Sequence, residues 1–263
     1  MGNRFGTVTQ WIPGAVSATF RKTGLTVDEI LALCQECHLS AIEWSENAHV
    51  MPNDPEGARL LGEKTRSAGL RIAAYGSYYR LGMQADVFRA SLVSAKALGA
   101  PIIRVWAGTT GSQETPEDTR DSWTREARTI AQIAAQEKIR VAFEWHKGTL
   151  TDTNQSAARL MREADHENLY CLWQPTVALS PRERAEGIEQ MARYLTNFHV
   201  YSWPDGTRGP LNAAEWQYYF EKAHGLSGEH FALLEFVRDD SIDQFRSDAR
   251  TLLSLVTEGE ENG

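Results

Sequence analysis

Short runs of apolar, often β-branched residues alternate with longer amphipathic runs along the whole chain. The short runs are typical of strands covered on both faces, and the longer ones of helices with one apolar face. Eight strands are predicted, at residues 5–11, 40–45, 71–77, 101–108, 140–146, 169–175, 197–203 and 231–237. Eight helices are predicted to follow them, at 26–38, 54–69, 84–99, 117–138, 153–166, 181–195, 212–225 and 241–256. The first helix begins with a capping-box spacing, Thr26 followed by Glu29.

Eight βα units in series predict an α/β fold, a single (β/α)8 TIM barrel, and 263 residues suit such a barrel. The competing fold is a doubly wound open sheet, which usually carries a glycine-rich phosphate turn after its first strand. The segment TQWIPGAVS at 9–17 contains no G-x-G-x-x-G. No change of composition marks a linker, so one domain over 1–263 is predicted, with the acidic tail from about 257 to 263 expected to be disordered.

Charge and composition narrow the class of protein. The net charge is −8 and no Lys/Arg stripe is present, which argues against a nucleic-acid partner. No apolar run reaches the roughly 18 residues of a membrane span, and the first residues lack a signal pattern. The three cysteines, Cys34, Cys37 and Cys171, form no disulfide framework, and the C-x-x-C pair fits two thiols on a helix face. These features together favour a cytoplasmic location.

Polar residues occur where the predicted strands end, which is where barrels of this kind carry their chemistry. These residues are Glu43, Tyr75, Trp106, Glu144 with His146, Gln174, His199 and Glu235. Glu144, Gln174, His199 and Glu235 follow consecutive strands at intervals of 30, 25 and 36 residues, each about one βα unit. We therefore expect these four at one rim of the barrel.

Two carboxylates, an imidazole and an amide oxygen suit a divalent metal, Mn²⁺ first and Mg²⁺, Co²⁺ or Zn²⁺ as alternatives. Glu144 in particular ends an apolar strand and requires a positive partner there. The alternative for any single one of the four is a hydrogen-bonded structural residue.

The segments RVWAG, FEWHKGTLTDT, LWQP, FHVYSW and LLEFV, in this order, resemble the sugar phosphate isomerase/epimerase superfamily, the xylose isomerase-like TIM barrels. The resemblance implies a metal held by Glu144, by the position of Gln174, by His199 and by Glu235. At Gln174 the family usually has an aspartate, so this chain offers one negative charge fewer. The metal is therefore expected to bind less tightly but to polarise a bound oxygen more strongly. Replacing Gln174 with Asp is expected to tighten metal binding.

The resemblance also implies an isomerase or epimerase that abstracts a proton next to a carbonyl, with Glu144 and Glu235 on opposite sides of a small carbohydrate or polyol. Glu235 is the first candidate for the base. His146 lies two residues after Glu144, so it is predicted to face the same side and to bind a substrate oxygen or act as an acid. Alternatively, His146 only orients Glu144.

Further substrate contacts are predicted for the aromatic residues Tyr75 and Trp106. They are also predicted for Lys147 and Arg208 in rim loops, where the alternative is a charge that is only solvated.

Two other functions stay open. The same base could expel a β-substituent, giving a metal-dependent lyase or dehydratase for a keto-sugar, or the barrel could be a non-catalytic sugar-binding or partner subunit. The resemblance implies homo-oligomers, dimers or tetramers.

Overall fold

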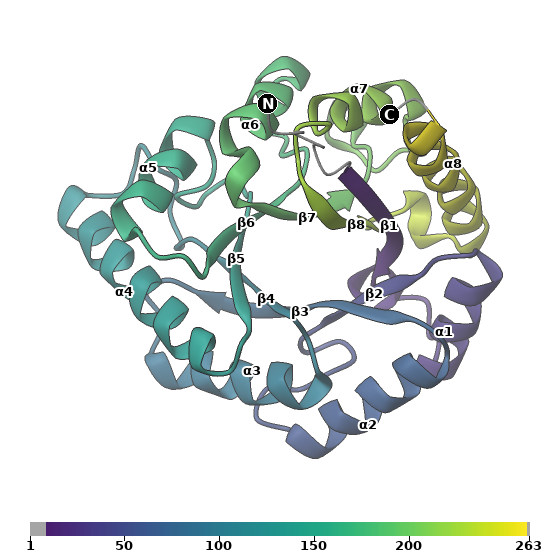
Figure 1. Cartoon of the computed structure of the whole chain (residues 1–263), viewed down its shortest axis with the longest axis horizontal. Helices are drawn as coiled ribbons and strands as arrows, with labels where there is room; N and C mark the ends of the chain where they lie inside the picture. Colours follow the sequence, from purple (N-terminus) through teal and green to yellow (C-terminus); the bar gives the residue numbers. More distant parts are fainter. Residues whose placement is uncertain (1–8, 262–263) are drawn as a thin grey trace, which may run out of the picture.

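The computed structural model describes residues 9–261, which form a closed barrel of eight parallel strands inside a ring of eight α-helices (Figure 1). The strands follow one another around the barrel in chain order, and β8 pairs with β1. They are β1 (Thr9–Val16), β2 (Ala41–Ser45), β3 (Arg71–Arg80), β4 (Ile102–Trp106), β5 (Arg140–Glu144), β6 (Leu169–Trp173), β7 (Leu195–Val200) and β8 (Gly228–Leu234). The helices are α1 (Val27–Glu36), α2 (Pro55–Ser67), α3 (Ala85–Leu98), α4 (Glu117–Gln136), α5 (Asn154–Ala164), α6 (Pro181–Met191), α7 (Ala213–Lys222) and α8 (Ile242–Glu261). The predicted (β/α)8 barrel is confirmed.

The first strand differs from its prediction. It was expected at 5–11, of which 5–8 lie outside the described residues, but β1 continues through Pro13 and Gly14 to Val16. Glycine at position 14 allows β1 and β2 to lie close together, because a Cβ at Gly14 would lie 2.5 Å from the carbonyl oxygen of Ala41.

The C-terminal segment forms helix over most of its length. Helix α8 runs to Glu261 and so includes much of the segment predicted as a disordered tail, while residues 262–263 lie outside the described part. Cys34, Cys37 and Cys171 are free and buried. Over the described residues, no helix has the combination of length and apolar character that crossing a membrane requires.

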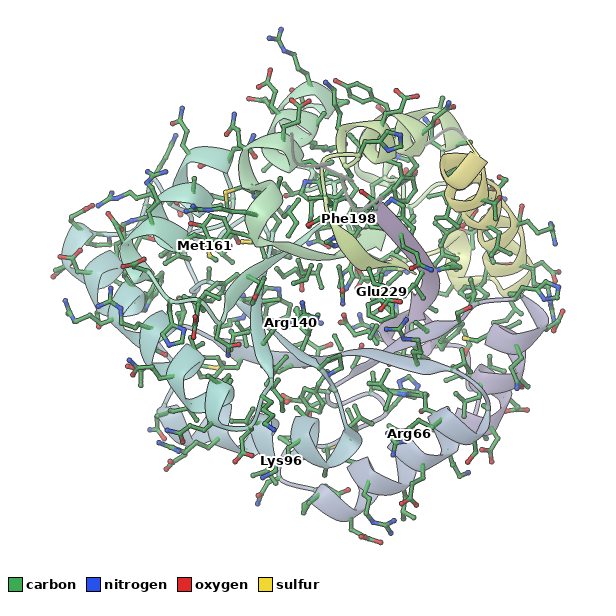
Figure 2. All side chains as sticks on the ribbon, viewed as in Figure 1. Arg66, Lys96, Arg140, Met161, Phe198 and Glu229 are labelled. Carbon is green, nitrogen blue, oxygen red and sulfur yellow. The ribbon has the colours of Figure 1, made fainter. Side chains whose placement is uncertain are left out.

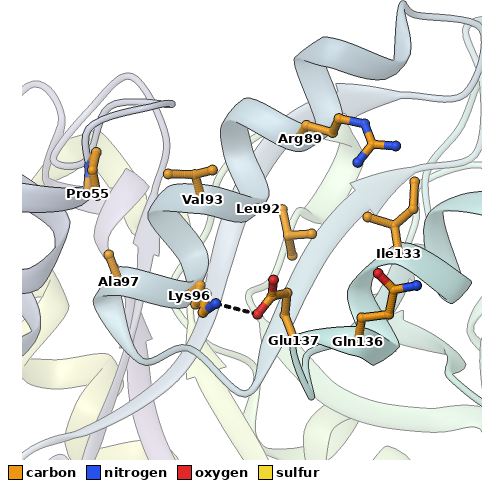
Figure 3. Close-up of a pocket in the computed structure, with 9 residues that line it drawn as sticks. All are labelled: Pro55, Arg89, Leu92, Val93, Lys96, Ala97, Ile133, Gln136 and Glu137. Carbon is orange, nitrogen blue, oxygen red and sulfur yellow. Dashed lines mark ion pairs between the residues drawn. The ribbon is translucent and has the colours of Figure 1, made fainter.

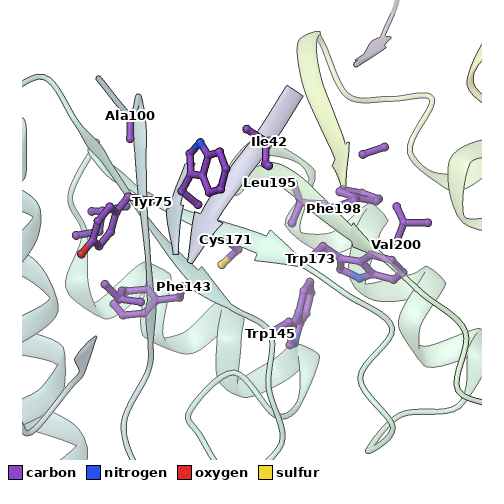
Figure 4. Close-up of a cluster of buried hydrophobic side chains, with 14 of the residues drawn as sticks. Ile42, Tyr75, Ala100, Phe143, Trp145, Cys171, Trp173, Leu195, Phe198 and Val200 are labelled. Atoms are coloured by element: carbon purple, nitrogen blue, oxygen red, sulfur yellow. The ribbon is translucent and has the colours of Figure 1, made fainter. Parts of the chain in front are cut away.

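Two apolar layers follow from the alternation of side chains along the strands. One face of each strand packs against the helices; part of this layer, which includes Phe143, Trp173 and Phe198, is drawn in Figure 4. The other face fills the barrel interior with smaller clusters, one of them built on Ile102 and Ala142. Figure 2 shows Arg140 and Glu229 on the inner ring of strands and Arg66 and Lys96 on the surrounding helices.

Helix α1 has the predicted capping box. The Thr26 side chain accepts a hydrogen bond from the Glu29 backbone N–H, and the Glu29 side chain accepts one from the Thr26 N–H. Two N–H groups that the helix itself leaves unpaired are thereby satisfied.

We expect Thr26→Ala to lower the free energy of unfolding by about 1 kcal/mol, because the N-terminal amide loses its acceptor. Urea unfolding of the variant beside Thr129→Ala measures the difference. Thr129 bonds to the carbonyl of Arg125 inside α4, so its replacement removes no cap. Equal stability of the two variants would contradict a capping role.

Candidate active site

Six polar side chains are buried together within the barrel, each no more than 5% exposed. They are Glu43, Arg104, Glu144, Gln174, His199 and Glu235. Each lies within a strand or directly after one. Side chains two residues apart in a strand face the same side, so each polar residue shares a face with the residue two positions before it. Ala142 and Leu172, for example, belong to an interior cluster and precede Glu144 and Gln174. Strand alternation therefore directs the six polar side chains into the barrel.

Arg104 joins two of the carboxylates. Its Nε lies 3.0 Å from Glu144 Oε2, and its Nη2 lies 3.6 Å from Glu43 Oε1. Its Nη1 donates a hydrogen bond to the carbonyl oxygen of Ser77, at 2.9 Å. Burial lowers the pKa of Arg104, but Glu144, Glu43 and Glu235 outweigh this and raise it, so the guanidinium stays charged inside the barrel.

His199 joins the other two carboxylates. Its Nε2 lies 3.1 Å from Glu43 Oε2, and its Nδ1 lies 3.2 Å from Glu235 Oε2. Burial lowers the pKa of His199, but Glu235 and Glu43 outweigh it and raise the pKa to about 10. Burial likewise raises the pKa of Glu43, but His199 and Arg104 bring it below its usual value. The imidazole is therefore held as a cation between two carboxylates.

Gln174 bonds to one of the residues with which it was expected to share a metal. Its Nε2 donates to Glu144 Oε1 at 2.9 Å and to the carbonyl oxygen of Trp145 at 2.7 Å. A backbone carbonyl only accepts, so the amide nitrogen and not the oxygen must face this pair. The amide oxygen is buried and has no hydrogen-bond partner among residues 9–261.

Gly76 of β3 leaves the space in which Glu43 and Arg104 meet. A Cβ at this position would lie 2.6 Å from Glu43 Oε1 and 2.9 Å from Arg104 Nη2. Distances below 3.0 Å require the ion pair to move.

We expect Gly76→Ala to cost about 1–3 kcal/mol of unfolding free energy, because the added methyl group overpacks a buried charged cluster. Urea unfolding tests this beside Gly225→Ala, where an added Cβ meets nothing within 4 Å. A cost no greater than that of Gly225→Ala would show that the pair moves aside freely.

A cavity of about 230 Å³ opens onto this cluster. Arg104, Glu144, Gln174 and Glu235 line it on the barrel side. The rest of the lining includes aromatic side chains and exposed cations, among them Tyr78, Trp106, Tyr201, Trp203, Phe236, Arg21 and Lys147.

The structure brings most of the predicted substrate-binding residues to this cavity. His146, Trp106 and Lys147 line it, although β5 ends at Glu144, two residues before His146. Tyr75 does not line it: its buried hydroxyl donates to Glu46 Oε2 at 2.8 Å. Arg208 does not line it either, and forms an ion pair with Asp240.

Two members of the cluster were not assigned a role from the sequence. Glu43 was noted at a strand end, but its contact with His199 spans 156 residues of sequence. Arg104 lies within the segment PIIRVWAG, where it is the single charge in an apolar strand. A lone charge at a position that must be buried is a signal of an ion pair or a site, and it would have identified Arg104.

The donor chemistry does not fit the metal that the family resemblance implies. Glu144 faces the Arg104 guanidinium and the Gln174 amide nitrogen, and both ring nitrogens of His199 face carboxylates. Within the described part of the chain, no three His, Cys, Asp or Glu side chains are grouped as metal coordination requires.

A second hollow lies far from this chemistry, on the outer face between α3 and α4 (Figure 3). It is lined by Leu92, Val93 and Ile133, among others, and the ion pair of Lys96 with Glu137 crosses it. It holds no cluster of acid, base or nucleophile comparable to that of the barrel interior.

Comparison with known proteins agrees with the fold. The family described as Xylose isomerase-like TIM barrel matches residues 31–230. A 3-dehydroshikimate dehydratase of Bacillus anthracis is 26% identical over an alignment of 222 residues, and the alignment covers 77% of this chain and 73% of that protein. The solved structure of the probable 3-DHS dehydratase AsbF of Bacillus anthracis, 18% identical, has a TM-score of 0.77 and covers 93% of this chain and 98% of its own.

Other solved structures share the fold at lower identity. An L-ribulose 3-epimerase has a TM-score of 0.72 at 12% identity, over 95% of each chain. The IolI protein with a binding zinc atom has a TM-score of 0.70 at 14% identity, over 94% of this chain and 98% of its own. At these identities the likeness shows the fold alone.

Proposed function

Because the chain belongs to the xylose isomerase-like TIM barrel family, we propose that it is an enzyme that removes a proton next to a carbonyl of a small carbohydrate or polyol, as an isomerase or epimerase. One observation carries the proposal. Two buried carboxylates, Glu144 and Glu235, line the same cavity beside the buried guanidinium of Arg104. A base next to a fixed positive charge suits a reaction in which negative charge develops on an oxygen.

Glu235 is assigned as the base. Its Oε2 lies 3.2 Å from His199 Nδ1, and its side chain lines the cavity in which a substrate would bind. The developing enediolate oxygen would receive hydrogen bonds from Arg104 and His146, which line the same cavity. The proton leaves the carbon for Glu235 and the electron pair moves to the oxygen, so charge is conserved and no oxidant is needed.

The contacts of Glu144 favour isomerisation over epimerisation. Both of its oxygens face N–H groups, of Gln174 and of Arg104, so it holds these side chains in place. In an isomerase Glu235 itself returns the proton to the neighbouring carbon, while the hydroxyl proton on that carbon moves to the first oxygen and leaves the new carbonyl. An epimerase needs a proton donor on the opposite face, and there His146 is the candidate.

Dehydration is the second candidate, and the 26% identical 3-dehydroshikimate dehydratase is the observation that favours it. The same base would act, and the electron pair would expel a β-hydroxyl group as water after protonation by His146. Arg21 and Lys147 at the cavity would suit a substrate that carries a carboxylate.

The test is incubation with a panel of aldoses, ketoses, their phosphates and 3-dehydroshikimate in D₂O, followed by NMR. An isomerase or epimerase incorporates deuterium at the carbon next to the carbonyl. A dehydratase converts 3-dehydroshikimate into an aromatic product that absorbs in the near ultraviolet. Saturable binding of a sugar with neither exchange nor product would instead support the non-catalytic sugar-binding alternative.

A further inference from the structure

We propose that Arg104 replaces the divalent cation in this chain, so that a guanidinium supplies the positive charge of the site and no divalent metal binds there. The inference about metal binding stands on the contacts of the buried cluster alone. The inference that Arg104 stabilises the reaction intermediate rests on the proposed function.

The first step concerns space and charge beside Glu144. Its Oε2 lies 3.0 Å from Arg104 Nε, at the distance of a close ion pair. A metal ligated by this oxygen would have to lie next to the guanidinium, which cannot lose its proton. Repulsion between two cations inside a buried cluster opposes that arrangement.

The second step concerns Gln174. An amide binds a hard cation through its oxygen, but here the nitrogen faces Glu144 and Trp145 O. The amide oxygen is buried without a hydrogen-bond partner within residues 9–261, so Gln174 meets Glu144 through its nitrogen and not through the oxygen that a metal would take. Gln174 and Glu144 are therefore bonded to each other instead of sharing a third partner.

The third step concerns His199. A metal needs the lone pair of one ring nitrogen, and both ring nitrogens lie within 3.2 Å of a carboxylate oxygen. One of these carboxylates, Glu43, belongs to β2 and is also 3.6 Å from Arg104. Glu43 thus connects the imidazole to the guanidinium, although its Oε1 and the Nδ1 of His199 are buried without a hydrogen-bond partner within residues 9–261.

The guanidinium also has a free donor for a substrate. Its Nη2 lies 3.6 Å from Glu43 Oε1, beyond hydrogen-bond distance, and no other hydrogen bond within residues 9–261 involves this nitrogen. Arg104 lines the cavity, and Nη2 is the donor that the proposal assigns to an enediolate oxygen. A fixed guanidinium stabilises such an oxyanion by charge-assisted hydrogen bonding.

The first experiment measures metal directly. Protein purified without chelator is analysed for Mn, Co, Zn and Mg, and then titrated with Mn²⁺ and with Zn²⁺ by calorimetry. Wild type is expected to contain far less than one equivalent and to show no saturable site that His199→Ala removes. One equivalent of metal, lost in His199→Ala, would overturn the proposal.

Variants of Arg104 test whether its charge excludes the metal. The double variant Arg104→Met, Gln174→Asp removes the cation and restores a carboxylate, and we expect a saturable Mn²⁺ site at least roughly a hundredfold tighter than the weakest binding that the wild-type titration can detect. The matched variant Arg104→Lys, Gln174→Asp keeps the positive charge and should bind as weakly as wild type. Equal Mn²⁺ binding by the two folded variants would overturn the role of Arg104, and the wild-type measurement stands even if either variant fails to fold.

Activity gives an independent outcome. Once the D₂O panel identifies a substrate, the exchange rate of wild type should be unchanged after dialysis against EDTA and unchanged on addition of Mn²⁺ or Zn²⁺. Loss of exchange with EDTA and recovery with metal would overturn the metal-free site while leaving proton abstraction intact. Absence of any reaction would contradict the proposed function. The proposal that no divalent metal binds would then be decided by the metal titrations alone.

Discussion

Glu235→Gln is expected to reduce the rate of proton exchange next to the substrate carbonyl by about 10²–10⁴-fold, because an amide cannot accept the proton. The side chain keeps its shape, and His199 keeps its contact with Glu43, so we expect the variant to fold. The exchange rate in D₂O, measured by NMR on the substrate found in the panel, gives the result.

Glu229→Gln is the matched control for this loss of activity. Glu229 belongs to the same strand, β8, but its carboxylate is exposed and pairs with Arg71. The same chemical change there should leave the exchange rate within about twofold of wild type, since the side chain does not line the cavity. Normal exchange by Glu235→Gln would remove Glu235 from the role of base.

Arg104→Met is expected to lower the free energy of unfolding by about 3–5 kcal/mol. The substitution keeps an unbranched side chain of similar length but leaves Glu43 and Glu144 buried without their common cation. Glu43 keeps His199 as a positive partner, but Glu144 loses its ion pair, and a buried carboxylate without a cation is costly whether it stays charged or takes up a proton. Urea unfolding followed by circular dichroism measures the change.

Arg71→Met provides the comparison. Arg71 pairs with Glu229 at the other end of the barrel, where both side chains are 49% exposed. Solvent screens that pair, so its loss should cost no more than about 1 kcal/mol. If Arg104→Met were equally mild, the buried carboxylates would not depend on the guanidinium, and its assignment as the charge of the site would fail.

Much of the fold could be predicted from the sequence because its signals are local. Alternation of apolar strands and amphipathic helices needs only neighbouring residues to be recognised, and so does the capping box at Thr26. Boundaries were less accurate where packing overrides a local signal. Pro13 and Gly14 are residue types typical of a turn, yet strand β1 continues through them. Glycine is needed there because β2 lies too close to leave room for a side chain.

The sequence by itself determined which side chains enter the barrel interior near the C-terminal ends of the strands. Glu144, Gln174, His199 and Glu235 follow from strand periodicity, and the structure buries all four. Only the tertiary structure decided their partners, because barrel closure brings Glu43 within 3.1 Å of His199, 156 residues away in the chain. It likewise set Arg104 beside Glu144 and turned the Gln174 nitrogen towards the same carboxylate. The residue type indicates which partners a side chain can bind. The charged groups that the fold places next to it determine which of these partners it binds.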